Sequence, residues 1–164
     1  MKQQKNTKTF LTLFLIVATE LIGFGLIIPI LPQIATRFQV NALLIGFLLA
    51  SYSIAQFFAA PILGKLSDKY GRKPILIFSK IGTILSYIIF AYANNYMMLL
   101  IARTLDGFTG GNIAVARAYV ADITTKENRS KGMAIIGISF GTGFILGPAL
   151  GGFVYQDDGG HFLA

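Results

Sequence analysis

Five apolar blocks, each long enough to cross a bilayer, dominate this sequence of 164 residues. They cover residues 10–31, 42–63, 75–93, 96–121 and 132–155. A helix of ~20 apolar residues crosses the hydrocarbon core, and a helix satisfies its own backbone polar groups there. Charged residues make up only 13% of the chain, against about 25% in soluble domains. We therefore predict an all-α membrane protein, with five transmembrane helices in a single membrane domain over residues 1–164.

Basic residues alternate between the two sides of this predicted arrangement. Cytoplasmic loops carry an excess of lysine and arginine. Here the excess precedes the first block (Lys2, Lys5, Lys8), separates the second from the third (Lys65, Lys69, Arg72, Lys73, with Lys80 just after) and separates the fourth from the fifth (Lys126, Arg129, Lys131). The other two loops hold only Arg37. The pattern predicts a multi-pass protein of the inner or plasma membrane with a cytoplasmic N-terminus. The net charge of +7 is then explained by basic residues beside membrane lipid, and no nucleic-acid partner is expected.

Glu20 lies near the middle of the first block. A carboxylate at this depth costs about 2.5–3.5 kcal/mol on insertion scales, so it is expected to face protein or water. A low dielectric disfavours its charged form, which suits reversible proton binding. Two interpretations stand side by side: a site for proton or substrate coupling, and a protonated structural glutamate held by hydrogen bonds.

The fourth block contains Arg103 and Asp106, which share one helical face because they are three residues apart. They could simply neutralise each other. A buried pair is weak evidence for stability alone, so we favour a charged cavity wall that contacts substrate or the coupling proton, with Asn112 as a further polar group. Tyr52 and Gln56 also share a face in the second block. We expect them to make an interhelical hydrogen bond, with cavity lining as the alternative.

Residues 64–74 form a basic connection between the second and third blocks. Asp68 and Arg72 are four residues apart, and Arg72 could reach Asp122 at the inner end of the fourth block. Together with Lys73, such a cluster would lock the inner ends of the helices in one state and release them in the other. Solvated loop charges, worth about 0–1 kcal/mol, are the alternative. Three residues that shape tight turns favour the cluster: Gly64, Gly71 and Pro74.

The fifth block carries glycine at every fourth position. Small residues in a stripe allow close helix packing in lipid, and an internal proline bends a helix. The residues concerned are Gly143, Gly147, Pro148, Gly151 and Gly152. We predict close packing here, and control of the bend during transport is an additional hypothesis.

These motifs resemble the major facilitator superfamily. Residues 64–74 are similar to its signature loop, Gly-x-Leu-x-Asp-x-x-Gly-Arg followed by Arg or Lys. The run from Leu99 to Gly107 resembles the fourth-span motif, and residues 143–152 resemble the fifth-span motif of antiporters. Residues 22–32 are similar to the first span of drug:proton antiporters of the tetracycline-efflux type, and Glu20 falls where those proteins carry an aspartate.

The resemblance implies the first five of twelve spans, that is, an N-terminal half-bundle without its sixth helix and without the C-terminal half. It implies that Asp68 and Arg72 gate, that Arg103 serves coupling or substrate, and that Gly147-Pro148 shapes the antiporter helix. The implied function is proton-coupled efflux of a drug or amphiphile. The sequence departs from tetracycline exporters in mid span three, where Ser86-Tyr87 replaces a carboxylate. This departure argues against tetracycline itself.

A metabolite or sugar carrier of the same fold, and a truncated fragment that transports nothing, remain open alternatives. An enzyme is not expected, because the single histidine, His161, lies in the tail and no nucleophile has a base beside it. No cofactor is expected. Asp157, Asp158 and His161 could touch a metal, but a solvated tail is the preferred interpretation.

Overall fold

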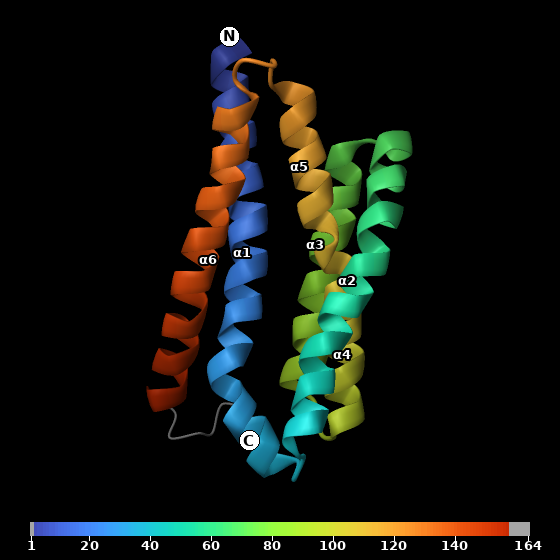
Figure 1. The fold of residues 1–164 in the computed structure, drawn as a ribbon, viewed down its shortest axis with the longest axis vertical. Coiled ribbons are helices and arrows are strands. Elements are labelled where there is room, and N and C mark those ends of the chain that lie inside the picture. Colours follow the sequence, from blue (N-terminus) through green and yellow to red (C-terminus); the bar gives the residue numbers. More distant parts are fainter. Residues whose placement is uncertain (1, 158–164) are drawn as a thin grey trace.

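The computed structural model describes residues 2–157, and these residues form a bundle of helices (Figure 1). In chain order the elements are α1 (Lys2–Arg37), α2 (Ala42–Tyr70), α3 (Arg72–Ala91), α4 (Tyr96–Gly110), α5 (Asn112–Ile123) and α6 (Arg129–Asp157). The described part of the chain contains no strand. The predicted all-α class is confirmed.

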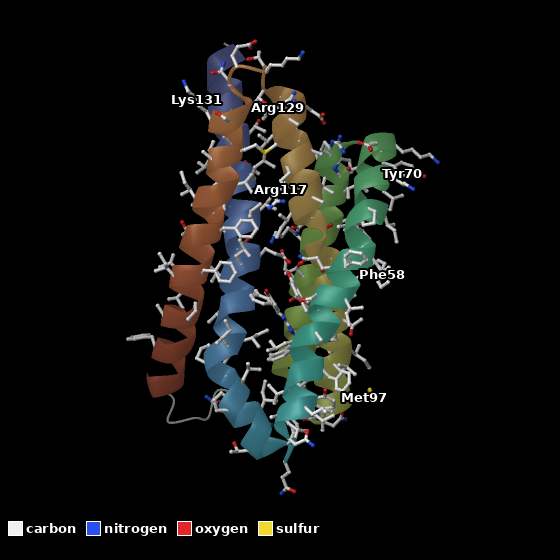
Figure 2. All side chains as sticks on the ribbon, in the orientation of Figure 1. Phe58, Tyr70, Met97, Arg117, Arg129 and Lys131 are labelled. Atoms are coloured by element: carbon white, nitrogen blue, oxygen red, sulfur yellow. The ribbon has the colours of Figure 1, made fainter. Side chains whose placement is uncertain are left out.

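The chain passes up and down the long axis of the bundle (Figure 1). The N-terminus, the α2–α3 connection and the α5–α6 connection lie at one end, and the α1–α2 and α3–α4 connections lie at the other. Figure 2 shows Tyr70, Arg129 and Lys131 toward the first end and Met97 toward the second. The three basic segments of the sequence therefore gather at one end of the molecule, which is called the basic end below.

Within residues 2–157, four helical segments are long and apolar enough to cross a membrane: Lys8–Ile34, Ala42–Tyr70, Arg72–Ala91 and Arg129–Phe153. The predicted fourth span, 96–121, is not one continuous helix. It is divided into α4, with 15 residues, and α5, with 12 residues, each too short to cross alone. Gly111 separates them, with φ −58° and ψ −5°. The fourth pass is therefore made by two consecutive helices from Tyr96 to Ile123.

The helices extend past the apolar blocks, so the connections are shorter than the sequence suggested. Gly71 alone joins α2 to α3. Its φ of 98° is a conformation that glycine adopts without strain, and its N–H donates to the carbonyl of Ser67 at 3.0 Å. The expectation that Gly64 shapes this turn was wrong, because Gly64 lies inside α2. The turn depends on Gly71, and Pro74 sits in the first turn of α3.

Large apolar side chains cover the outside of the bundle. Phe57 is 75% exposed and Phe58 is 60% exposed, and Figure 2 shows Phe58 pointing away from the helices. An apolar outer surface of this extent suits lipid or further protein rather than water.

Inside, two buried apolar clusters lie toward opposite ends of the bundle. The cluster toward the basic end contains Leu13, Leu63 and Val120, and the other contains Ile34, Leu48 and Leu99. Along the chain, the buried polar residues Arg103, Asp106 and Asn112 fall between these clusters, and buried Glu20 lies beside Leu21 of the first cluster. We call these four residues, with the side chains that contact them, the central polar layer.

Candidate functional site

Glu20 is the meeting point of three helices in the central polar layer. Its side chain is 1% exposed. Lys80 of α3 places its Nζ 2.6 Å from Glu20 Oε2, and Asn112 of α5 donates from Nδ2 to the same oxygen at 3.0 Å. The Thr83 hydroxyl donates to the carboxylate at 3.4 Å and also lies 3.2 Å from Thr109 Oγ1. Of the two expected surroundings, protein or water, the structure shows protein, and a charged partner holds the carboxylate.

Arg103 and Asp106 form the second ion pair of the layer. Arg103 Nη1 donates to Asp106 Oδ2 at 2.8 Å, and both side chains are almost fully buried. The guanidinium carbon also lies 4.5 Å from the ring centroid of Tyr52 and 5.5 Å from that of Phe24. An aromatic face attracts a cation, and the attraction strengthens when both are desolvated. The two residues pair along one helix face, which was the alternative to the favoured cavity wall, and aromatic rings from α2 and α1 enclose them.

Gln56 links the second and fourth passes. Its Nε2 donates to the Tyr52 hydroxyl at 3.1 Å and to the carbonyl of Gly110 at 3.0 Å. The second bond is the predicted interhelical hydrogen bond, which is confirmed. A Cβ added at Gly110 would lie 2.8 Å from the Tyr52 hydroxyl and 3.2 Å from Glu20 Oε1. A glycine at this position therefore lets the two ion pairs share one compact layer.

The layer has more hydrogen-bonding capacity than its described partners use. It holds two cations and two carboxylates, so its formal charge is zero. Within residues 2–157 the following buried atoms have no hydrogen-bond partner: Arg103 Nε and Nη2, Asp106 Oδ1, Asn112 Oδ1 and the Tyr87 hydroxyl. Unused donors and acceptors in a low dielectric are unstable unless water or a changed partner satisfies them. These unpartnered donors and acceptors could therefore form the hydrogen bonds that a bound proton or a rearranged ion pair would need, without any further polar group.

A second charged cluster, the inner cluster, lies at the basic end. Arg72 donates from Nε to Asp122 Oδ2 at 2.7 Å, and its Nη1 lies 2.6 Å from Asp68 Oδ1. The same Nη1 donates to the Ser67 hydroxyl at 2.6 Å. The predicted reach from Arg72 to Asp122 is confirmed, and it connects the end of α2 and the start of α3 to the end of α5. Lys73 is exposed and joins none of the ion pairs found in the described part of the chain.

The glycine stripe of α6 lies against α1. A Cβ added at Gly147 would lie 2.7 Å from Gly25 Cα, and one added at Gly151 would lie 2.6 Å from Pro29 Cγ. Gly143 meets Leu21 in the same way, and Pro148 packs beside Gly25. Figure 1 shows α1 and α6 side by side along their length. Gly152 differs from the other stripe residues, because a Cβ there would meet nothing within 4 Å.

Three residues of the central polar layer were not predicted from the sequence: Lys80, Thr83 and Thr109. Lys80 was counted with the charges of the basic connection, although it lies eight residues after Arg72 inside an apolar run. Lys80 and Thr83 are three residues apart and so share a helical face, which was the available signal. In the tail, Asp158 and His161 lie outside the described residues.

Comparison with known proteins defines the class. Residues 13–162 match the Major Facilitator Superfamily. The chain therefore belongs to this superfamily of membrane proteins, as its motifs suggested.

Particular relatives share much of this chain. It is 43% identical over 150 residues to the tetracycline resistance protein, class H, of Pasteurella multocida, covering 90% of this chain and 38% of the relative. The class B protein of Escherichia coli is 41% identical over 151 residues, covering 90% and 37%. The crystal structure of the human organic anion transporter MFSD10 (TETRAN) matches with a TM-score of 0.80 and 29% identity, over 96% of this chain and 44% of that one. The chain thus spans less than half the length of these relatives.

Proposed function

We propose that this chain contributes the first five spans of a proton-coupled exporter that moves a small drug or amphiphile by alternating access. The observation that carries the proposal is Glu20, a carboxylate 1% exposed that one lysine and one asparagine hold between three helices. A buried ionisable group within a membrane span is by default a functional one. Relatives named for tetracycline resistance support drug efflux as the activity.

The burial of the central polar layer favours proton binding over direct substrate contact. Arg103 and Asp106 are each 1% exposed in the described part of the chain. A cavity wall that contacts substrate would have to face open space. We therefore assign proton coupling to Glu20, and we assign to Arg103, Asp106, Asn112, Tyr52 and Gln56 the role of supporting that site.

Proton uptake on Glu20 would change how two parts of the bundle hold together. Neutral Glu20 no longer attracts Lys80, so the ionic link between α1 and α3 is lost. Because the glycine stripe packs α6 closely on α1, these two helices would move together relative to the other four. Rigid-body movement of packed units is a common form of alternating access.

The inner cluster is the proposed gate. The side chains of Asp68 and Asp122 are 64% and 52% exposed, and exposed ion pairs contribute only about 0–1 kcal/mol each. The cluster can therefore hold the inner ends of α2, α3 and α5 together in one state and release them in another. The gate would face the cytoplasm, because positive residues gather there, in an inner or plasma membrane.

Everted membrane vesicles that contain the product of the full open reading frame test the proposal. With an acidified interior, a pH-quenched dye reports proton release when a probe compound is added, here the amphiphilic cation ethidium. We expect proton release from the wild type and only background release from Glu20→Gln, because the amide cannot take up a proton. The matched control is Glu127→Gln, which removes an exposed glutamate in the α5–α6 connection. Unchanged proton release in Glu20→Gln would overturn the assignment.

A further inference from the structure

Lys80 is the only charged group in direct contact with Glu20 among the described residues, at 2.6 Å. The other two partners, Thr83 and Asn112, are neutral donors. A neutral donor can hydrogen-bond to a carboxylic acid as well as to a carboxylate. A lysine charge distinguishes the carboxylate from the carboxylic acid, because it stabilises only the ionised carboxylate.

The remaining ionisable groups of the layer do not replace Lys80. On α4, Arg103 is already paired with Asp106. On α2 and α3 the groups facing the layer are the phenols Tyr52 and Tyr87, and α5 reaches Glu20 through the amide of Asn112. Residues 132–154 of α6 include no ionisable side chain. Among the described residues, the only ion pair that Glu20 makes is therefore with α3.

When Glu20 is neutral, the ammonium of Lys80 can turn toward the basic end of the bundle. Its side chain is 22% exposed, whereas that of Glu20 is 1% exposed. Lys80 lies eight residues after Arg72, which places it about 12 Å from the basic end at the rise of an α-helix. A lysine side chain near a helix end can keep its ammonium at the interface while its methylenes stay in apolar surroundings.

We propose that Lys80 sets the pH at which Glu20 exchanges its proton. The ion pair with Lys80 requires an ionised Glu20. A proton that binds Oε2 removes the ion pair and frees Lys80 to turn toward the basic end. This inference rests on the proposed function, because it assigns to a positioning residue on α3 control of the same proton site.

Chemical labelling tests the inference without any transported compound. Dicyclohexylcarbodiimide partitions into membranes and reacts with protonated carboxyl groups, and the N-acylurea that it forms on Glu20 can be located by mass spectrometry. The product of the full open reading frame is labelled in native membranes over a series of pH values. We expect the pH dependence of Glu20 labelling in the Lys80→Met variant to lie about 1–3 pH units above that of the wild type. A displacement of this size is usual when an adjacent opposite charge is lost.

Three comparisons make the result specific. Lys80→Arg keeps the positive charge, so its labelling curve should stay close to that of the wild type. Lys126→Met removes an exposed lysine of the α5–α6 connection and should change nothing. Asp106, paired with Arg103, serves as a reference carboxyl within the same protein and should respond less than Glu20.

Labelling of Glu20 at an unchanged pH in Lys80→Met would overturn the inference, and so would an equal displacement in Lys80→Arg. If Lys80→Met does not accumulate in the membrane, Lys80→Gln, which keeps a hydrogen-bond donor without the charge, is judged by the same criterion. The two proposals fail separately. Proton release that survives in Glu20→Gln removes the proposed coupling site, whereas an unmoved labelling curve removes only the role of Lys80.

Discussion

At the scale of single residues, one arginine connects three chain segments at the basic end. Arg72 bonds Ser67, Asp68 and Asp122 through two of its nitrogens. The spacing of Asp68 and Arg72 could be read from the sequence, and so could the reach to Asp122. The Ser67 contact could not, because it depends on the single-residue turn at Gly71, which brings the end of α2 against the start of α3.

Neutralising one of the two carboxylate partners of Arg72 should loosen the inner ends without unfolding the protein. For Asp122→Asn we expect a change of no more than about 1 kcal/mol in the free energy of unfolding, because the carboxylate is half exposed. Amide hydrogen exchange at the end of α2 and the end of α5 should become up to about fivefold faster, the factor that corresponds to 1 kcal/mol. Hydrogen–deuterium exchange with mass spectrometry measures this. Glu127→Gln is the control, and exchange rates equal to those of the wild type would contradict the proposed gate.

Lys80 shows why part of the site could not be predicted from sequence. A lysine soon after a basic connection is ordinarily a charge at the membrane interface. Its true position followed from the length of α2, which continues to Tyr70 and leaves no loop before α3. Glu20, Arg103 and Asp106 could be predicted, because charges deep in apolar blocks are rare enough to stand out.

At the scale of elements, the α1–α6 contact is a backbone contact. A Cβ at Gly147 would meet Gly25 Cα at 2.7 Å and the carbonyl oxygen of Ile22 at 2.8 Å, and neither atom belongs to a flexible side chain. The periodic glycines predicted this packing. The break between α4 and α5 was not predicted, because residues 96–121 form one apolar block in the sequence. Gly111 lies against α2, where a Cβ would be 3.0 Å from the backbone nitrogen of Ala60.

Substitution in the stripe should therefore separate two whole helices. We expect Gly147→Ala to destabilise the protein by about 1–3 kcal/mol, since α1 and α6 must move apart to admit a methyl group. The control, Gly141→Ala, lies on the same helix with nothing within 4 Å of its Cβ. It should be neutral or stabilising by up to about 1 kcal/mol, because alanine favours a helix more than glycine does. Thermal unfolding in detergent, followed by circular dichroism, compares the two; equal stabilities would refute the packing role.

At the scale of the whole molecule, the structure places all three basic segments at one end. The sequence alone predicted this arrangement, because the alternation of basic loops and the number of apolar blocks both depend only on chain order. It did not predict the lengths of the connections, which depend on how far each helix continues beyond the hydrocarbon.

Topology can be measured directly with introduced thiols, because the chain contains no cysteine. In intact cells we expect Asn94→Cys, in the α3–α4 connection, to react with a membrane-impermeant maleimide. We expect Lys126→Cys, in the α5–α6 connection, to react only after the membrane is opened. Lys69→Cys, near the end of α2, should behave like Lys126→Cys. Reaction of Asn94→Cys and Lys126→Cys from the same side would exclude the proposed topology.

The electroneutrality of the central polar layer has an electrical consequence. With two cations and two carboxylates, the layer gains one uncompensated positive charge when a proton binds. Moving a full elementary charge across the bilayer changes its electrical energy by about 2.3 kcal/mol per 100 mV. A charge that moves only to mid-depth crosses roughly half of that potential difference. On the proposed coupling role of Glu20, proton loading would then be driven by membrane potential as well as by acidity, so an energised cell would bias the proposed cycle even where the pH on its two sides is equal.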